Sequence, residues 1–421
     1  MKTLVLITSQ FPFGTSESFL ESEFPFLIND FDKIIIIAQN VSGKRTRDVS
    51  DNVIIHRYNT STSFPEFLRL PILIFLNFRT IFYLLHEETG FRRETRYHIS
   101  LRNFLFLFKK IIKTLQLRDY IKAKLLKEAI GQNIVFYSYW LKTGAHAISL
   151  LEYKHSIKFA RAHGSDLYEE RTDSGYLPLM RFSAQKLNAI FFTSKHGMDY
   201  FSAKVKQKKM SFLVSRLGVN RPEAKNIKVN ISDEYVIVSC SNMIPLKRID
   251  LIIDALDTVR YHRKIVWLHF GDGVLRNELE SLAGIKLGST DRIRYRFMGH
   301  YPNNDLLDFY SFNKVDLFIN TSSTEGIPVS IMEAQSFGIP VIATDTGAVK
   351  EIVVEGTGSL LPVGFKTDDL SKMIEYYANL PKNENDNIRM NAIRNWESNF
   401  NATSNYKDFI MKVNSILASV K

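Results

Sequence analysis

The stretch Ser322 to Pro340 reads S-S-T-E-G-I-P-V-S-I-M-E-A-Q-S-F-G-I-P, and the rest of the chain can be placed around it. It follows V-D-L-F-I-N (315–320), a short β-branched and aromatic run that is typical of a buried strand. Pro328 suits the first position of a helix, because the N–H that it lacks is not needed there, and Gly338 followed by Pro340 ends that helix. The order strand, loop, helix predicts a parallel α/β sheet that binds its ligand at the carboxyl ends of the strands.

Two acids, Glu325 and Glu333, stand eight positions apart in this stretch. Gly326 lets a ligand approach the backbone, and we expect the amides of residues 329–331 to be free to receive an anion such as a diphosphate. A carboxylate accepts hydrogen bonds from a pair of hydroxyls, so each acid suits a sugar or a ribose. The alternative interpretation is an ordinary helix whose two acids are solvated surface charges.

The segment E-G-I-P-V-S-I-M-E-A, followed by G-I-P-V-I-A-T-D-T-G-A-V-K-E-I-V, resembles the E-x7-E region of retaining, nucleotide-sugar-dependent glycosyltransferases of family 4. The resemblance is to the enzymes that build bacterial capsules, exopolysaccharides and O-antigens. It implies the α/β GT-B fold, in which two Rossmann-like domains face a central cleft and a C-terminal helix crosses back to the first domain. It places Glu325 at the donor-sugar hydroxyls, as a catalytic residue, and Glu333 at the ribose. Donor binding is implied for the residues between them, namely Gly326, Ile327, Pro328 and Val329.

Length and composition agree with two domains. A chain of 421 residues suits two domains of roughly 200 residues each, and 45% hydrophobic residues suffice for two cores. The one cysteine, Cys240, excludes an internal disulfide and fits a reducing compartment. Residues 1–9 have too short an apolar run for a signal peptide and are predicted to form the first strand. No run of 18 apolar residues exists, so we expect a cytoplasmic protein that does not span a membrane.

The net charge of +11 is concentrated in one segment. Residues 92–127 hold eleven Lys or Arg against two acids, a net charge of +9. They belong to an insertion, residues 64–130, that is rich in Phe, Leu and Ile. Its helices either lie on an anionic membrane surface, which would make the protein peripheral on the inner face of the plasma membrane, or pack on the first domain with a solvated basic face. Nucleic-acid binding ranks below both, because no recognition motif accompanies the charge.

Two patches of the first half contribute candidate site residues. After the first strand, Gly14 stands where GT-B enzymes carry a glycine loop, and we assign it to the donor. Thr15 and Ser16 are assigned to the acceptor, although either can instead cap the next helix. Glu17 can be explained as an acid that complements the dipole of that helix.

The second patch is F-A-R-A-H-G-S-D-L-Y-E-E (159–170), which resembles a stretch of the polysaccharide-synthesising members of the family. The resemblance places His163 beside the donor sugar and leaving phosphate, as a catalytic residue. A satisfied core histidine is the alternative. Asp166 orients His163, caps the next helix or binds the acceptor, and capping is the most conservative assignment. The D-x-D formed by Asp30 and Asp32 lies on the approach to the second strand, so we assign no metal site to it, and the resemblance implies neither metal nor cofactor.

In the second half, a strand at 235–239 leads into C-S-N-M-I-P-L-K-R-I-D, where the family pattern is roughly G-R-x-x-P-x-K-G. Lys247 falls on the lysine that neutralises the donor diphosphate, unless it is only a solvated lysine at the start of a helix. The arginine position holds Asn242 instead, so either Arg248 or another cation compensates, or the phosphate clamp is weaker. Met298 begins an M-G-H segment that the resemblance places against the nucleotide base.

These expectations combine into one hypothesis. Residues 1–217 form an acceptor-binding domain, residues 218–395 a domain that binds the nucleotide sugar, and residues 396–421 a helix that packs back on the first. The resemblance implies retaining transfer of a hexose or N-acetylhexosamine, from UDP-sugar as donor, to a hydroxyl of a glycan or of an acceptor on a polyprenyl diphosphate. The alternatives are a non-catalytic basic protein that binds lipid or nucleic acid, and an epimerase or phosphorylase on the same fold.

Overall fold

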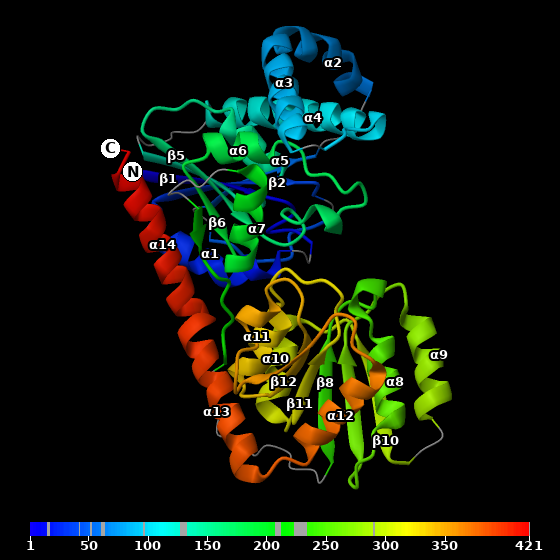
Figure 1. Ribbon diagram of the computed structural model, residues 1–421. Coiled ribbons are helices and arrows are strands. Elements are labelled where there is room, and N and C mark those ends of the chain that lie inside the picture. The colour runs from blue at the N-terminus through cyan, green and yellow to red at the C-terminus, as the bar shows by residue number, and fades with distance from the viewer. Residues whose placement is uncertain are drawn as a thin grey trace. The chain divides into compact units, whose positions relative to one another are not determined.

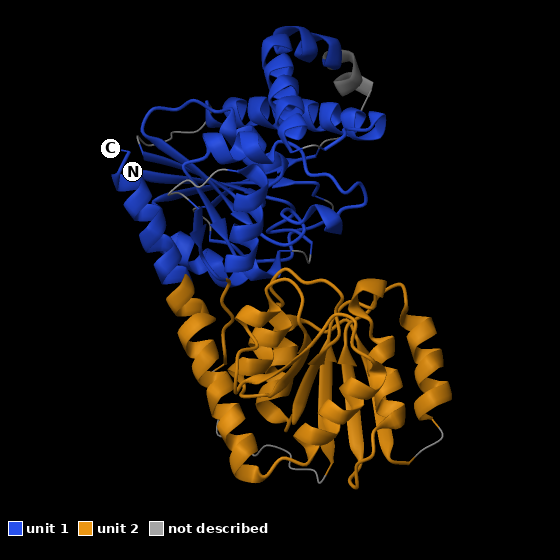
Figure 2. Cartoon of the chain, viewed as in Figure 1, with its two compact units in different colours: residues 1–216, 406–421 blue, residues 217–405 orange. Residues whose placement is uncertain are grey.

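The computed structural model describes residues 1–14, 17–41, 43–50, 53–59, 64–95, 97–126, 133–206, 212–222, 234–288 and 291–420. The chain divides into two compact units (Figure 2). The first unit comprises residues 1–216 and 406–421, and the second comprises residues 217–405. Each unit is a parallel sheet covered by helices, as expected from the sequence.

The sheet of the first unit has seven parallel strands in the order β3-β2-β1-β4-β5-β6-β7. The chain moves outward from β1 to β3 and then returns to the other side of β1, so its topological switch point lies between β1 and β4. The strands are β1 (Lys2–Thr8), β2 (Lys33–Gln39), β3 (Val53–Tyr58), β4 (Asn133–Ser138), β5 (Ser156–Ala162), β6 (Ala189–Phe192) and β7 (Phe212–Val214).

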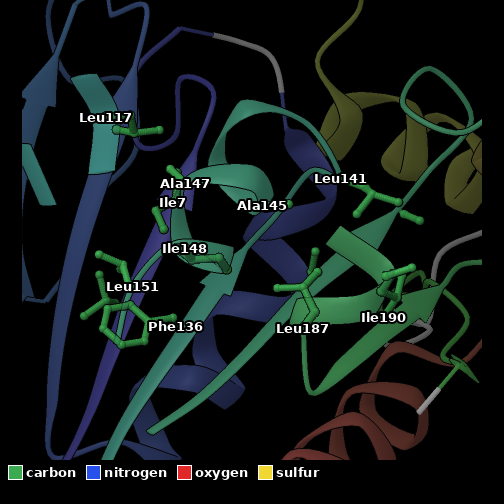
Figure 3. Packing of buried hydrophobic residues seen from close by; sticks show 14 of the residues in the cluster. Ile7, Leu117, Phe136, Leu141, Ala145, Ala147, Ile148, Leu151, Leu187 and Ile190 are labelled. Atoms are coloured by element: carbon green, nitrogen blue, oxygen red, sulfur yellow. The ribbon is translucent and has the colours of Figure 1, made fainter. Parts of the chain in front are cut away.

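Helices cover both faces of this sheet, because side chains alternate along each strand. Val5 and Ile7 of β1 face a core that α4 and α5 close, part of which is drawn in Figure 3. Leu4 and Leu6 face the opposite core, which is closed by α1 and α14. The helices are α1 (Ser18–Asp30), α2 (Phe64–Leu76), α3 (Phe78–Glu94), α4 (Leu101–Leu125), α5 (Thr143–Ser149), α6 (Met180–Lys186), α7 (Lys195–Val205) and α14 (Ala402–Ala418).

The insertion packs on the first unit. One face of α4 belongs to the core of the sheet, while another face joins α3 and α6 in a separate cluster, so α3 and α2 lie on the outer side of α4 (Figure 1). A buried ion network fixes this attachment. Arg92 of α3 contacts Glu88 on its own helix and Glu169 after β5, at 2.8 Å each. Because a buried charge that loses its partner is costly, this network holds the insertion firmly.

Among the described residues, no single helix is long and apolar enough to cross a bilayer. The segments Leu70–Leu76 and Phe78–Glu94 meet the criterion of length and composition only together, and they are bent by 76° at the break between them.

The second unit has six parallel strands in the order β10-β9-β8-β11-β12-β13, and its topological switch point lies between β8 and β11. The strands are β8 (Tyr235–Cys240), β9 (Ile265–Phe270), β10 (Ile293–Gly299), β11 (Leu317–Asn320), β12 (Val341–Thr344) and β13 (Gly358–Leu361). The helices are α8 (Asp250–Thr258), α9 (Arg276–Leu287), α10 (Asn303–Phe312), α11 (Val329–Ser336), α12 (Thr367–Ala378) and α13 (Lys382–Asn399).

The end of the chain differs in detail from the expected single helix over 396–421. Helix α13 ends at Asn399 and α14 begins at Ala402, and the chain passes into the first unit at Tyr406. The break coincides with a close approach of backbones, because a Cβ on Gly218 would lie 2.3 Å from Cα of Ala402. From there, Phe409 and its neighbours on α14 complete the core beneath the first sheet.

Candidate functional site

The main candidate site of the second unit lies at its switch point, where the loops after β8 and β11 meet. Ser323 donates its N–H to the carbonyl of Leu246 at 2.8 Å. The hydroxyl of Thr321 donates to the carbonyls of Lys247 and Arg248, at 2.9 Å each. These bonds hold the two loops in a fixed register at the carboxyl edge of the sheet, which is where ligands bind in this kind of fold.

Lys247 and Glu325 form an ion pair at this point. The Nζ of Lys247 lies 2.5 Å from Oε1 of Glu325, and the Nδ2 of Asn320 lies 3.5 Å from the same oxygen. Glu325 is buried, whereas the side chain of Lys247 is 20% exposed. The sequence predicted both residues for the site, and the structure brings them together. The pair presents a partly exposed cation that is held in position by a buried acid.

Helix α11 begins one residue later than predicted, although the predicted turn at Pro328 is present. Pro328 is the N-cap and the helix begins at Val329. The amide of Ile331 is not free as expected, since it donates to the carbonyl of Pro328 at 3.3 Å. The amides of Val329 and Ser330 have no hydrogen-bond partner among the described residues. They remain available to an anion, beside half-buried Gly326 and Ile327.

A second glycine secures the Glu325 loop from the neighbouring strand. Gly347 follows β12 with φ of 56°, and a Cβ at this position would lie 1.9 Å from the carbonyl oxygen of Glu325. Ala348 donates its N–H to the carbonyl of Gly326 at 3.0 Å. Only a residue without a side chain permits this contact, so the loop after β12 supports the candidate site.

Glu333 lies deeper in the second unit. Its side chain is buried on α11 and accepts a hydrogen bond from Asn303 Nδ2 at 2.6 Å. Burial raises the pKa of the Glu333 carboxyl to about 7, against the opposing effect of that hydrogen bond. The thiol of Cys240 has a pKa raised to about 12, first by burial and then by the charge of Glu333. Cys240, the last residue of β8, is therefore a protonated thiol.

Three further residues were predicted to bind the nucleotide sugar, and each lies in a different environment. The guanidinium of Arg248 donates to the carbonyls of Thr321 and Val363, at 2.7 and 2.6 Å, and to Oγ1 of Thr344 at 3.2 Å. Arg248 thus links three loops, and these contacts give no support to the idea that it replaces the missing arginine. Asn242 is exposed in the loop that carries Lys247. Met298 is half-buried at the end of β10, which is separated from β8 by β9.

His163 lies in the loop after β5 of the first unit. Its ring is buried against the rings of Tyr139 and Trp140, at centroid distances of 4.9 and 4.5 Å. Both ring nitrogens lack a hydrogen-bond partner among the described residues. A buried imidazole normally has its polar atoms satisfied, so His163 does not match the interpretation as a satisfied core histidine. The two nitrogens are available to another group.

Asp166 holds the loop of His163. Its two oxygens accept the backbone N–H groups of His163 at 2.7 Å and of Leu141 at 2.8 Å, and its Oδ2 lies 3.8 Å from Nδ1 of His163. Burial alone would raise the pKa of the Asp166 carboxyl, but His163, Lys142 and the Leu141 amide together bring it below its usual value. These contacts match a role for Asp166 in orienting His163, and within the described residues its carboxylate caps no helix.

Sequence reasoning missed the part played by Glu17. This residue is buried with φ of 61°, and its carboxylate accepts the amides of Ser9, Gln10 and Phe11 at 2.7 Å each. It also accepts the indole N–H of Trp140 at 2.6 Å. The carboxylate therefore does more than complement the dipole of α1, of which Glu17 is the N-cap residue. The sequence offered only an acid just before a helix, which does not distinguish a buried side chain from an exposed one.

Glu17 connects the remaining predicted residues of this unit. Gly14 has φ of 61°, and its carbonyl accepts hydrogen bonds from Thr46 at 2.5 Å and from Arg47 at 2.8 Å. Thr15 and Ser16 lie outside the described residues. Through Trp140, the carboxylate of Glu17 joins the loop after β1 to the His163 ring, at the switch point of the first sheet.

The described part of the chain holds no group of three or more His, Cys, Asp or Glu side chains placed to bind a metal ion. The acids of the D-x-D are in structural contacts. Asp30 pairs with Lys2 and Asn414, and Asp32 accepts the N–H of Lys2 at 2.6 Å.

Most of the second unit is similar to a known protein family. Residues 220–395 match the family described as glycosyl transferases group 1. An uncharacterized glycosyltransferase of Methanocaldococcus jannaschii is 24% identical over 253 residues, which are 60% of this chain and 67% of the relative. The O-antigen biosynthesis glycosyltransferase WbnH of Escherichia coli is 31% identical over 103 residues, which are 23% of this chain and 29% of the relative.

Solved structures match both units. The sucrose-phosphate synthase of Thermosynechococcus elongatus matches with a TM-score of 0.70 and 13% identity, and all of both chains is covered. Anabaena HepE, solved in complex with UDP and glucose, matches with a TM-score of 0.63 and 15% identity over 98% of this chain and 99% of that one. The fold is GT-B, as expected, and residues 220–395 match the group 1 glycosyl transferase family.

Proposed function

We propose that this protein transfers a hexose or N-acetylhexosamine from a UDP-sugar to a hydroxyl of a growing bacterial surface glycan, with retention at the anomeric carbon and without a metal ion. The observation that carries the proposal is the Lys247 to Glu325 pair at 2.5 Å, which adjoins the unpartnered amides of Val329 and Ser330. A cation and two free amides are suited to the diphosphate of a nucleotide sugar. The group 1 family match of this unit supports the same assignment.

Within the second unit each residue has a distinct role in this proposal. Lys247 neutralises the charge that develops on the leaving diphosphate, and Glu325 holds hydroxyls of the donor sugar. Glu333 binds the ribose, and Met298 lies toward the base. The choice of UDP is supported by the structural likeness to HepE, whose structure contains UDP and glucose. The resemblance of the E-x7-E segment to family 4 supports retention.

The first unit supplies the acceptor side. His163, whose two ring nitrogens are without partners, serves as the hydrogen-bonding group at the reacting centre. The resemblance implies a front-face reaction in which the leaving phosphate helps to remove the proton of the acceptor hydroxyl. Asp166 keeps His163 in place rather than contacting the acceptor, because both of its oxygens already accept backbone amides.

We further propose that the protein works at the inner face of the plasma membrane, on an acceptor attached to a lipid carrier. The bend between α2 and α3 exposes Phe75, Leu76 and Phe82, at 77, 73 and 71% of their surface. Beside it lies an apolar hollow of about 490 Å³, lined by Ile74, Phe78, Arg79, Ile81, Phe82 and Leu85. An exposed apolar surface of this kind, next to a basic helix, suits an anionic bilayer. We call the exposed side chains of residues 72–82 the α2–α3 elbow.

One experiment tests the reaction. The purified protein is incubated with a panel of UDP- and GDP-sugars and glycan acceptors, and released nucleoside diphosphate is measured together with the anomeric configuration of the product. We expect UDP release that requires an acceptor, and an α-linked product from an α-linked donor. An inverted product would refute retention. Free sugar formed without acceptor, or a requirement for phosphate, would instead indicate an epimerase or phosphorylase.

A further inference from the structure

Four lysines gather where the insertion meets the body of the first unit. Lys109, Lys110 and Lys113 lie on adjacent turns of α4, and Lys142 is the N-cap residue of α5. Lys109 is exposed and the other three are half-buried. Within the described residues none of the four forms an ion pair with a carboxylate. We call them the lysine cluster.

The charges of the lysine cluster act on one another. Burial lowers the pKa of the Lys110 amino group to about 8, and the charges of Lys113, Lys142 and Lys109 contribute to this lowering. The pKa of Lys113 is lowered by burial and by Lys109. Like charges repel each other, and within the described residues Lys109, Lys110 and Lys113 have no carboxylate that pairs with them. A bound anion would relieve the repulsion, so the cluster has the electrostatics of an anion site.

The lysine cluster adjoins the loop of His163. The Nζ of Lys142 lies 3.2 Å from the hydroxyl of Ser165 and 5.4 Å from the ring centroid of Trp140, which in turn contacts His163. Lys142 also contributes to the lowered pKa of Asp166. An anion on the cluster would therefore be held next to the group that the proposed function places at the reacting centre.

Exposed apolar side chains precede the lysines on the same helix. Leu101 and Leu105 are 75 and 60% exposed, and Phe104 is 39% exposed. Leu101, Leu105 and Lys109 are spaced four residues apart, so they form one stripe along α4. The stripe changes from apolar to cationic within two turns, which matches a hydrocarbon chain that ends in a phosphate group.

We propose that the lysine cluster binds the diphosphate of an acceptor attached to a hydrocarbon chain, and that Leu101, Phe104 and Leu105 contact the first part of that chain. This inference rests on the proposed glycosyl transfer and names the class of its acceptor. The charged group would be bound by several lysines at once, and each contact is a charge-assisted hydrogen bond. The sugar or hydroxyl beyond the diphosphate would then extend toward His163.

The test uses the full chain and a water-soluble probe, farnesyl diphosphate. Its binding is measured by titration calorimetry for the wild type, for Lys109→Gln/Lys113→Gln, and for the control Lys122→Gln/Lys124→Gln. The control removes the same charge from the other end of α4. UDP binding and thermal melting are measured for all three proteins. Parallel titrations use farnesol, inorganic diphosphate, and vesicles with and without phosphatidylglycerol.

We expect the cluster variant to bind farnesyl diphosphate at least about tenfold more weakly, which corresponds to about 1.4 kcal/mol. The control should bind like the wild type, farnesol should bind to none of the proteins, and inorganic diphosphate should compete weakly. The inference would be overturned if both variants lost farnesyl diphosphate binding equally, or if the cluster variant lost none. A loss confined to phosphatidylglycerol vesicles would also overturn it, and would assign the lysines to bilayer headgroups. Failure of the wild type to bind UDP would refute the proposed function itself.

Discussion

The two units place candidate residues at the same topological position, the switch point of a parallel sheet, but they assemble them differently. In the second unit the site is built from charged side chains, Lys247 and Glu325, with two free backbone amides. In the first unit a buried carboxylate, Glu17, accepts hydrogen bonds from four N–H groups, one of them the indole of Trp140, whose ring contacts His163. The comparison indicates that one unit offers charge for a ligand, whereas the other uses charge to organise its own loops.

The largest expected effect on activity comes from removing the negative charge of Glu325 in the second unit. Glu325→Gln should lower sugar transfer by a factor on the order of 10² to 10³, because in the proposed function it removes the carboxylate that holds the donor sugar and positions Lys247. The measurement is the rate of UDP release with acceptor, together with a thermal melt to show that the fold is retained. The matched control is Glu278→Gln, which alters an exposed acid on α9. Transfer at a nearly normal rate would remove Glu325 from the site.

The deeper acid of the second unit should make stability depend on pH. The Glu333 carboxyl has a pKa raised to about 7, from an ordinary value of 4.5 for a glutamate. The native state therefore binds this proton more tightly than the unfolded chain does. The associated stabilisation is complete below about pH 4 and is lost as the pH rises through about 7, by about 3 kcal/mol in total.

Urea unfolding of the wild type and of Glu333→Gln at pH 5 and pH 8 measures this dependence. We expect the wild type to lose stability relative to the variant at the higher pH. A difference between the two proteins that stays constant with pH would show that the Glu333 carboxyl titrates normally.

In the first unit, replacing the buried acid Glu17 should lower the stability of the fold. Glu17→Gln leaves one acceptor oxygen for four N–H groups, so at least one buried donor loses a charge-assisted bond. We expect a loss of about 2 kcal/mol in the free energy of unfolding. Glu21→Gln is the control, since it breaks only the partly exposed ion pair with Arg47 and should cost less than about 1 kcal/mol. Equal losses in the two variants would contradict the organising role of Glu17.

The smallest expected effect concerns the α2–α3 elbow, an exposed apolar surface of the first unit that lies outside its candidate site. Phe75→Ser/Phe82→Ser should weaken binding to anionic vesicles by about tenfold or more, because each exposed ring would bury apolar area in the bilayer. The control, Val274→Ser/Ile285→Ser, removes two equally exposed apolar side chains from the second unit. Sedimentation with vesicles measures both variants. If neither variant differs from the wild type, the elbow does not face the membrane.

The sequence predicted the second unit better than the first, for a physical reason. Glu325 and the turn at Pro328 lie in one short segment whose residue types indicate a ligand site. Lys247 lies in a second short segment, where the resemblance to family 4 identified it. Glu17 and Trp140 come from loops more than 100 residues apart, and only the order of the strands brings them together. The contacts of Arg248 with Thr344 and Val363 depend on tertiary structure in the same way.

The exposed apolar elbow also illustrates what composition cannot decide. A helix rich in Phe and Leu indicates burial, yet which of its faces is covered depends on the neighbours that pack against it. Leu84 is fully buried while Phe82, two positions earlier, remains 71% exposed. The two interpretations of the insertion were therefore not exclusive, since its helices pack on the first unit and still expose an apolar surface.

The network around Arg92 limits how this protein can be redesigned. Glu169, in the same segment as His163, depends on an arginine from the insertion and also pairs with Lys204 of α7. A chimera that exchanges α2 to α4 for the equivalent region of another enzyme would leave that carboxylate buried beside one lysine. Grafts that aim to change acceptor preference should therefore carry Arg92 and residues 159–170 together, as one interchangeable cassette.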